Sequence, residues 1–333
     1  MTRKNAFVLF FTFLFQILHQ AICSSKIPFL PTKCDKLFGS SIIHLSTTAS
    51  TAKSTTSIKY LRTKTFTQNE AVNIIDTILF PIDQYKKRLK IARDAQFSTG
   101  LGVDANSNES SSLNSNVMSA SDPRLSFTYD EFPVQSMDQL LELAMEEYKK
   151  SHNGQKPKVL VDLGSGCGRL VLHAAICEEK NDSGNNNLMF DHIHGIEISK
   201  ALHEIGVRAL DIGAKEGYFT KCIQDDGTEN EGAPSVSLHL GDANDLSNIL
   251  HQADMVFTYS TVFDTKCFDE RLGAMILSDE WSKMLASVCQ KGCIVVTTDR
   301  ALDPQHGWQL QCSLDVENPK LMGTTGYISK LQK

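Results

Sequence analysis

Hydrophobic and polar positions follow a regular pattern over the second half of the chain. From residue 158 onward, short runs of β-branched and other apolar residues alternate with stretches of helical spacing. This alternation predicts an α/β fold with a mostly parallel sheet covered by helices. The last two runs have no helix between them, which predicts an antiparallel hairpin at one edge of the sheet. The seven predicted strands are residues 159–163, 193–198, 236–240, 255–259, 294–298, 308–314 and 326–331.

A helical extension is predicted ahead of this region. Thr67 and Glu70 have the spacing of a capping box and precede apolar residues at helical spacing, so we expect ordered structure to begin at Thr67. Pro81 should end or kink this helix, because a proline inside a helix removes a hydrogen bond and clashes with the preceding turn. Residues 82–97 then suit a second, basic helix.

Composition defines the remaining domain boundaries. Residues 100–121 are rich in Ser and Asn with almost no large apolar residue, which predicts a mobile linker. A cap at Ser136 predicts another helix through Tyr148. The chain is therefore predicted to contain a helical extension at 66–99, the linker, and an α/β domain at 122–333.

The first residues have the order of a secretory signal peptide. Arg3 and Lys4 precede an apolar run at 6–18, and small residues follow at 21–24. A transmembrane anchor is the alternative, but a run of about thirteen residues is shorter than the roughly twenty that span a bilayer. We expect a signal peptide at 1–23 and entry into the secretory pathway.

Residues 24–65 have the composition of a transit peptide. They are rich in Ser and Thr, carry scattered Lys and Arg, and contain Asp35 as their single acidic residue. A signal followed by such a segment resembles the bipartite leaders of algae whose plastids are wrapped in extra membranes. A flexible secreted linker is the alternative. We expect this segment to be disordered.

Charge is distributed unevenly along the chain. The whole sequence has a formal net charge of −6, but the first 65 residues contain nine Lys or Arg and one acid, which leaves 24 basic and 38 acidic residues in the remainder. A net charge of −14 argues against nucleic acid as a partner, because phosphate contacts need clustered basic residues. The nine cysteines are too sparse and too irregularly spaced for a disulfide framework, and they include no CxxC pair.

The segment most informative about chemistry is residues 159–169, in which an apolar strand leads through a glycine-rich turn into a helix. Asp162 stands just before the turn, and a turn without Cβ atoms lets a ligand approach the backbone. A dinucleotide-binding turn would have glycine where Arg169 stands, and the Lys followed by Ser or Thr of a P-loop is missing. The alternating glycines of this turn are Gly164, Gly166 and Gly168, with Ser165 between the first two.

Later strands also end in polar side chains. Glu197 ends the second strand, Asp242 and Ala243 follow the third, and Tyr259 ends the fourth. The carboxyl ends of parallel strands meet at one edge of a sheet, where α/β proteins bind their ligands. A carboxylate such as Glu197 suits a vicinal diol, because its two oxygens can accept two hydrogen bonds.

The acid, the alternating glycines and the later strand ends resemble the class I S-adenosylmethionine-dependent methyltransferases. The resemblance implies a Rossmann-like seven-stranded sheet with S-adenosyl-L-methionine as the cofactor. It also implies that Asp162 contacts the methionine end directly or through water, that Glu197 binds the ribose hydroxyls, and that Asp242 accepts a hydrogen bond from the adenine amino group. The residues expected to bind the cofactor are Tyr129, Glu131, Asp162, Gly164, Ser165, Gly166, Gly168, Glu197, Asp242, Ala243 and Tyr259.

A closer resemblance covers roughly residue 127 to the C-terminus. The segment Phe-Thr-Tyr-Asp-Glu-Phe-Pro at 127–133, the motif Asp-Leu-Gly-Ser-Gly-Cys-Gly at 162–168 and the closing Gly-Thr-Thr-Gly-Tyr-Ile resemble the disruptor-of-telomeric-silencing family. These are the histone lysine methyltransferases without a SET domain, together with uncharacterised algal and bacterial relatives. In that family the loop before the capped helix folds over the methionine end of the cofactor, which implies this position for Tyr129 and Glu131.

Two departures separate the chain from the histone enzymes. Those enzymes carry an Asn pair and a Phe after the fourth strand, where this sequence has Tyr259-Ser260-Thr261, and they need a basic extension to hold nucleosomal DNA. We therefore carry over fold and cofactor but not the histone substrate. The open alternatives are a protein side-chain methyltransferase of the lysine type, a small-molecule methyltransferase for a plastid metabolite, and a non-catalytic cofactor-binding module.

No catalytic base can be identified, because an amine nucleophile that is already deprotonated needs none. Tyr259 and Ser260 are the candidates for lining the methyl-transfer channel. His192 and His194 share one face of a strand but lack a third ligand at useful spacing, so no metal is expected. The expected partner is a protein or small-molecule methyl acceptor, with no DNA and no stable membrane insertion after signal cleavage.

Overall fold

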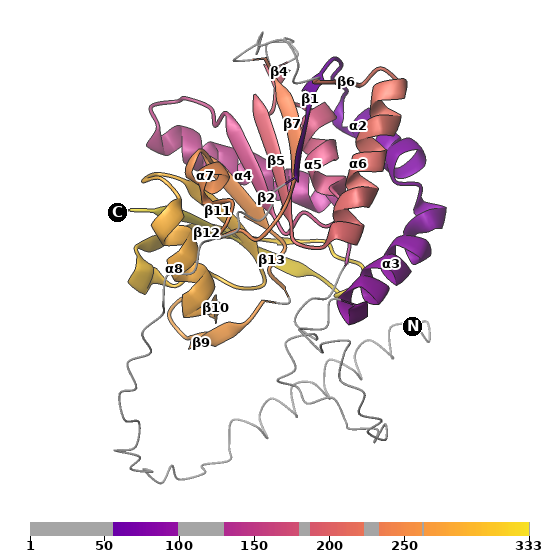
Figure 1. The fold of residues 1–333 in the computed structure, drawn as a ribbon. Helices are drawn as coiled ribbons and strands as arrows, with labels where there is room; N and C mark the ends of the chain where they lie inside the picture. Colours follow the sequence, from indigo (N-terminus) through magenta and orange to yellow (C-terminus); the bar gives the residue numbers. More distant parts are fainter. Residues whose placement is uncertain (1–55, 99–129, 180–186, 223–232, 262, 333) are drawn as a thin grey trace, which may run out of the picture. The chain divides into compact units, whose positions relative to one another are not determined.

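A nine-stranded mixed sheet is the central element of this computed structural model (Figure 1). The structure describes residues 56–98, 130–179, 187–222, 233–261 and 263–332, all within the unit Lys53–Lys333. The strands in order across the sheet are β12 (Trp308–Val316), β13 (Thr324–Leu331), β11 (Ile294–Thr298), β8 (Met255–Thr258), β2 (Val159–Leu163), β5 (His192–Glu197), β7 (Ser235–Leu240), β1 (Thr56–Arg62) and β6 (Phe219–Lys221).

The predicted α/β architecture is confirmed. Strands β11, β8, β2, β5 and β7 form an uninterrupted parallel ladder, and β13 runs antiparallel between β11 and β12. Each of the seven predicted strands lies within two residues of its observed bounds, including the antiparallel hairpin at the edge. The predicted signal peptide at 1–23, the predicted transit-like segment as far as residue 55 and the predicted linker at 100–121 lie outside the described residues.

Strand β1 shows that the predicted start of ordered structure at Thr67 is wrong. Its residues Thr56–Leu61 pair antiparallel with β7, and Tyr60–Arg62 pair antiparallel with the short strand β6 on the other side. Tyr60 is fully buried, and its hydroxyl donates to Asp211 Oδ1 at 2.5 Å. The Ser, Thr and Lys of this segment resemble a leader in composition, whereas its place in the fold rests on pairing with β7 and on the buried Tyr60.

The predicted helical extension is present. It comprises α2 (Gln68–Ile74), the π-helical turn η1 (Ile75–Leu79), the 3₁₀ turn η2 (Ile82–Gln84) and α3 (Tyr85–Ser98). The Glu70 carboxylate accepts hydrogen bonds from Thr67 N (3.0 Å) and Thr67 Oγ1 (2.7 Å), as the capping box predicts. Pro81 separates the two halves as predicted, because its fixed φ and missing N–H stop the helix.

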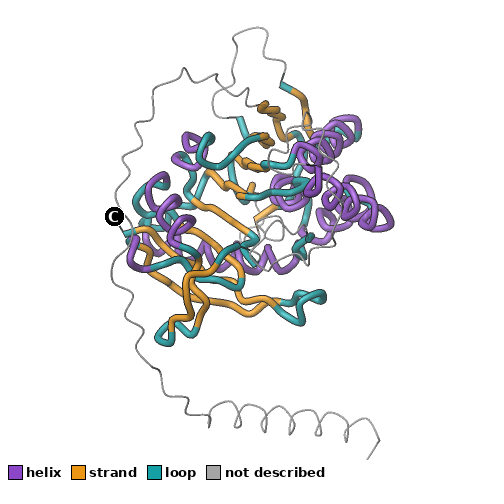
Figure 2. Tube along the Cα trace, turned by 60° about the horizontal axis from the view of Figure 1, so that its bottom comes forward, coloured by secondary structure: helices purple, strands orange, loops and turns teal. Residues whose placement is uncertain are grey.

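Helices cover both faces of the sheet, as Figure 2 shows. Apolar side chains of α2, α4, α5 and α6 pack on one face, and those of α7 and α8 pack on the other. Alternate strand residues point to opposite faces, so Leu160 joins the first core and Val161 the second. The bounds are α4 (Val134–Ser151), α5 (Arg169–Ile176), α6 (Lys200–Lys215), α7 (Ser247–His251) and α8 (Asp279–Val288).

Helix α4 begins earlier than the cap at Ser136 predicts. Pro133 occupies the cap position, and the Ser136 hydroxyl lies inside the helix, where it donates to Glu317 O at 2.5 Å. The smaller elements are β3 (Glu178–Glu179) with β4 (Asn187–Leu188), the ribbon of β9 (Thr265–Asp269) with β10 (Ala274–Leu277), and η4 (Pro304–His306). No helix within the described ranges is both long and apolar enough to span a membrane.

Candidate cofactor site

The candidate site lies at the carboxyl edge of the parallel strands, where the strand order reverses. Strand β2 has β5 on one side and β8 on the other. The helix that leads into β5 (α5) and the helix that leads into β8 (α7) pack on opposite faces of the sheet. Such a reversal opens a crevice outside the carboxyl ends of the strands, which is the usual ligand position in open α/β sheets. The predicted residues of β2, β5, β7 and β8 all stand at this edge.

The glycine-rich turn is held against the neighbouring strand. The N–H groups of Gly164 and Ser165 both donate to Ile196 O, at 2.9 and 3.0 Å. Gly164, Gly166 and Gly168 have φ values of 78°, 57° and 78°, a left-handed conformation that favours glycine. A Cβ added at Gly164 would meet no atom within 4 Å, so this part of the turn leaves open space for a ligand.

Glu197 joins the turn to the end of β5. Its side chain is buried, with Oε2 accepting from Gly166 N and Oε1 from Ser199 N, both at 2.7 Å. Burial raises the pKa of this carboxyl, and the backbone N–H groups oppose that effect. Each oxygen has a second lone-pair site, so the carboxylate retains the capacity to accept two hydroxyl hydrogen bonds.

Asp162 is the least satisfied polar group of the site. Its side chain is 4% exposed, and Oδ2 has no hydrogen-bond partner among the described residues. Burial, and then the nearby charge of Glu197, raise the pKa of Asp162 to about 8. A buried polar atom without a partner costs free energy, so the site is incomplete without a polar ligand group.

The adenine side of the predicted pocket is formed at the end of β7. Gly241 N donates to Glu197 O at 3.0 Å, which places Asp242 and the buried Ala243 beside the end of β5. Asp242 Oδ1 accepts from Asn244 N at 2.8 Å, which orients the carboxylate.

Sequence reasoning missed Ile198, which is 56% exposed immediately after Glu197. The sequence feature that could have identified Ile198 is an apolar residue directly after the acidic residue that ends a strand.

Tyr259 and Ser260 differ in their surroundings. Tyr259 is half-buried, its hydroxyl accepts from Asn318 Nδ2 at 3.2 Å, and burial raises its pKa. Ser260 is fully buried, and its hydroxyl donates to Thr298 O and accepts from Thr298 N. Ser260 therefore joins β8 to β11, and the structure gives it no exposed surface with which to line a channel.

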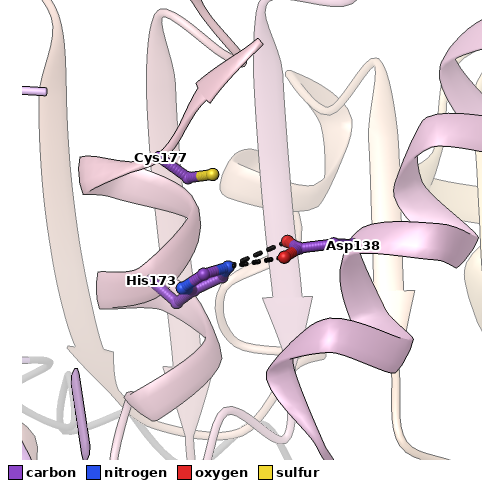
Figure 3. A group of neighbouring side chains, drawn as sticks. All are labelled: Asp138, His173 and Cys177. Carbon is purple, nitrogen blue, oxygen red and sulfur yellow. Dashed lines mark hydrogen bonds and ion pairs between the residues drawn. The ribbon is translucent and has the colours of Figure 1, made fainter. Parts of the chain in front are cut away.

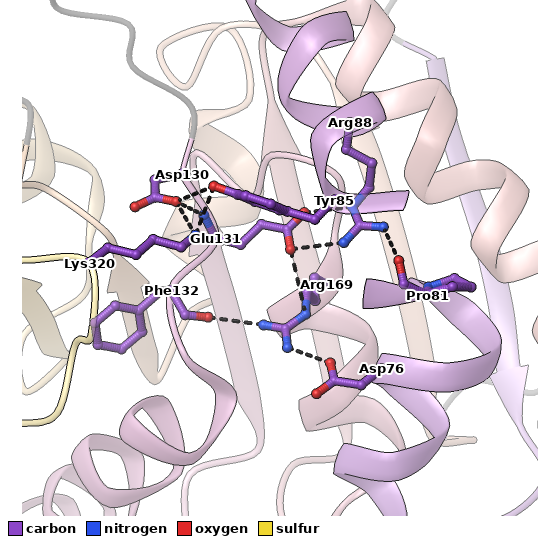
Figure 4. Close-up of polar contacts among 9 residues, drawn as sticks. All are labelled: Asp76, Pro81, Tyr85, Arg88, Asp130, Glu131, Phe132, Arg169 and Lys320. Atoms are coloured by element: carbon purple, nitrogen blue, oxygen red, sulfur yellow. Dashed lines mark hydrogen bonds and ion pairs between the residues drawn. The ribbon is translucent and has the colours of Figure 1, made fainter. Parts of the chain in front are cut away.

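Glu131 is engaged in ion pairs, whereas the sequence predicts a cofactor contact. Its Oε1 lies 2.6 Å from Arg88 Nε, and its Oε2 lies 3.9 Å from Arg169 Nε (Figure 4). The carboxylate is thus already shared by two guanidinium groups beside the glycine-rich turn. Tyr129, the other predicted residue of this loop, lies outside the described residues.

A buried cluster of potential metal ligands lies between α4 and α5. Suitable atoms of Asp138, His173 and Cys177 lie within 4.8 Å of one another (Figure 3). However, His173 Nε2 lies 2.8 Å from Asp138 Oδ1, a direct hydrogen bond, and Cys177 Sγ donates to Glu178 O at 3.6 Å. The His173–Asp138 contact therefore joins α5 to α4.

Two further groups of polar side chains make contacts among themselves. In the group of Asp279, Asp303 and His306, the Lys266 ammonium lies 2.9 Å from Asp279 and 2.7 Å from Asp303, in the place of a cation. The histidines singled out in the sequence lie apart from the candidate site residues, with His192 Nδ1 3.0 Å from Ser235 Oγ, and His194 Nδ1 3.0 Å from His239 Nε2. Burial lowers the pKa of His194 to about 3 and that of His239 to about 4.

Comparison with known proteins finds distant structural similarity alone. No protein-family profile and no curated protein matches the chain. The similar solved structures include the m1A22 tRNA methyltransferase TrmK of B. subtilis, which is 9% identical over 61% of this chain and 68% of that chain, with a TM-score of 0.35. Trm1 of Pyrococcus horikoshii with S-adenosyl-L-methionine is 10% identical over 61% and 56% of the two chains (TM-score 0.34). The ribosomal protein L11 methylase of Lactobacillus delbrueckii subsp. bulgaricus is 13% identical over 61% and 81% (TM-score 0.31).

The strand order and strand directions decide the architecture. The fold is that of the class I S-adenosylmethionine-dependent methyltransferases. Strands β1 and β6 extend this class I sheet at the β7 edge, and the helical extension packs on the face covered by α5 and α6.

Proposed function

We propose that the protein is an S-adenosylmethionine-dependent methyltransferase. The observation that carries the proposal is the juxtaposition of Asp162, Glu197 and Asp242 at the ends of three adjacent strands, around a glycine turn with open space at Gly164. Any one of these acids alone would fit a helix cap or a solvated loop. Three at one sheet edge, one of them with a buried oxygen that lacks a partner, favour a ligand with several polar groups.

The residues present fit this cofactor. Asp162 would hold the methionine end, Glu197 the ribose hydroxyls and Asp242 the adenine amino group, with the exposed Ile198 covering an apolar ring. The cofactor supplies a sulfonium whose methyl group is electrophilic. The protein therefore needs chiefly to align the acceptor with the methyl group, exclude water and receive a proton where the acceptor has one to lose. Tyr259 stands at the end of β8, where an acceptor would enter.

Calorimetric titration of the full chain with S-adenosylhomocysteine tests the cofactor. We expect binding by the natural protein, and affinity at least tenfold weaker in Glu197→Ala because the ribose hydroxyls lose their acceptors. Glu270→Ala, an exposed acid in the turn between β9 and β10, is the matched control and should bind normally. Absence of binding by the natural protein, or equal binding by the Glu197 variant, contradicts the proposal.

The acceptor that we propose is a protein side chain of the lysine type. The resemblance of the 127–133 segment and the 162–168 motif to the disruptor-of-telomeric-silencing family supports this choice. The Tyr259-Ser260-Thr261 segment departs from the histone enzymes, and the acidic domain weighs against binding nucleosomal DNA. Labelled cofactor incubated with fractionated extract should transfer label to protein. Label in the small-molecule fraction would indicate a metabolite methyltransferase, and binding without any turnover would indicate a cofactor-binding module.

We propose that the protein enters the secretory pathway. If residues 1–55 act as a bipartite leader, we propose that it continues to the plastid. The signal-like order of residues 1–23 and the Ser- and Thr-rich segment that follows support it. A fluorescent fusion should carry residues 1–55 only, because β1 begins at Thr56 and belongs to the fold. Cytosolic fluorescence of this fusion would contradict the proposal.

A further inference from the structure

A buried ion pair joins the helical extension to residues 130–132, which precede α4. Arg88 of α3 donates through Nε to Glu131 Oε1 at 2.6 Å and through Nη2 to Glu131 Oε2 at 3.0 Å. The two side chains are 6% and 9% exposed. A two-point contact between a planar guanidinium and a planar carboxylate fixes orientation as well as distance. Arg88 Nη1 also donates to Pro81 O at 3.0 Å, which anchors the arginine within the extension.

A second arginine connects the same segment to the glycine-rich turn. Arg169 is the first residue of α5, directly after Gly168, and its Nη1 donates to Phe132 O at 3.1 Å. Its Nη2 donates to Asp76 of the extension at 2.5 Å. Residues 130–132 therefore lie between the extension and the helix that follows the turn, as Figure 4 shows.

Phe132 extends this network to the acceptor side of the site. Its buried ring packs 5.0 Å from the ring of Tyr259 and 5.8 Å from that of Phe257, measured between centroids. Tyr259 follows β8, and Phe257 lies within it. A shift of Glu131 would therefore move the aromatic side chain that supports Tyr259.

An outer contact on the same segment is weaker. Asp130 accepts from the Tyr85 hydroxyl at 3.0 Å and pairs with Lys320, whose side chain is 41% exposed. Solvent screens such a pair and lowers its contribution. The buried Arg88–Glu131 pair therefore provides the main attachment of the extension to residues 130–132.

We propose that Arg88 is a positioning residue, which acts through Glu131 to hold residues 130–132 beside the glycine turn and so fixes the Phe132 and Tyr259 wall of the acceptor side. This inference rests on the proposed function for the identity of the ligand. It assigns the extension a role in the activity, because Arg88 joins the extension directly to Glu131, the neighbour of Phe132. Lysine cannot replace the arginine fully, since an ammonium lacks the two-point geometry.

Hydrogen exchange and ligand affinity of the full chain test the inference together. Arg88→Met keeps the length of the side chain and removes the charge, Arg88→Lys keeps the charge, and Arg93→Met on the exposed side of α3 is the matched control. We expect faster amide exchange over residues 131–137 in Arg88→Met without ligand, and S-adenosylhomocysteine affinity at least tenfold weaker. Arg88→Lys should lie between, and Arg93→Met should match the natural protein.

The outcomes separate this inference from the proposed function. Exchange and affinity that are unchanged in Arg88→Met, or changed equally in Arg93→Met, overturn the positioning role. If Arg88→Met does not fold, the milder Glu131→Gln must show the faster exchange, and unchanged exchange there overturns the role. If the natural protein binds no S-adenosylhomocysteine while exchange still rises in Arg88→Met alone, the proposed function fails and the positioning of residues 130–132 stands.

Discussion

Asp162 combines a cost in stability with a role in binding. The buried carboxyl has a pKa of about 8 in the folded protein, against an ordinary value near 3.8, so folding takes up a proton between these two pH values. A group that binds more protons when folded makes stability fall as pH rises, so the penalty grows from pH 3.8 and is complete above pH 8. Such a penalty is tolerable where a ligand group completes the site.

Asp162→Asn should therefore be more stable than the natural protein at pH 8 and lose affinity for S-adenosylhomocysteine. An amide has no ionised form, so the gain in melting temperature should be larger at pH 8 than at pH 5. The measurements are thermal unfolding at the two pH values and calorimetry at pH 8. Asp245→Asn in the exposed loop after β7 is the control. A variant that binds as tightly as the natural protein would remove Asp162 from the site.

The contact between His173 and Asp138 holds α4 against α5. Both side chains are fully buried, and Asp138 Oδ2 also accepts from Gln68 Nε2 of α2 at 2.5 Å. His173→Leu should lower the free energy of unfolding by about 2–4 kcal/mol, because it leaves a buried carboxylate short of a partner. The double variant His173→Leu, Asp138→Leu should recover part of that loss in urea denaturation. A chelator that lowered the melting temperature of the natural protein would instead show that the cluster holds a metal.

Strand β1 should be essential although its sequence resembles a leader. A chain truncated to begin at Phe66 loses the buried Tyr60 and exposes the edge of β7. A chain that begins at Lys53 retains Tyr60 and keeps that edge paired with β1. We expect the shorter chain to be less stable by about 3–5 kcal/mol, as for deletion of a large buried aromatic residue, and to aggregate through the open edge. Thermal unfolding and light scattering of the two chains provide the measurement. Equal stability would place β1 outside the cooperative fold.

Local pattern was sufficient for the parallel strands and for the turn between β2 and α5. Residues 159–163 are apolar except for Asp162, and the glycines of the turn that follows stand where the backbone needs positive φ. Strand β1 was missed because its burial depends on pairing with β7, some 180 residues later in the chain, and no short-range pattern encodes that contact.

The sequence predicts where the candidate site lies, but not which side chains its residues contact. Glu197 and Asp242 follow from the order of strands, because the carboxyl ends of a parallel sheet share one edge. The partner of Glu131 did not follow, since Arg88 lies 43 residues away on a helix with several other basic residues. Ser260 was misplaced because a serine at a strand end has the same local sequence whether its hydroxyl faces solvent or the next strand.

The net charge of the chain from Thr56 onward influences which acceptors it attracts. Because β1 belongs to the fold, the chain from Thr56 onward contains 27 basic and 38 acidic residues, a net charge of −11. An acidic surface attracts basic partners and repels nucleic acid, and salt weakens both effects over the Debye length of about 10 Å at 0.1 M. Methyl transfer to extract protein should therefore favour basic acceptors, and its initial rate at low acceptor concentration should fall several-fold between 50 and 300 mM salt. Transfer to a neutral small molecule would not change in this way, and label found in the nucleic acid fraction would contradict the electrostatic argument.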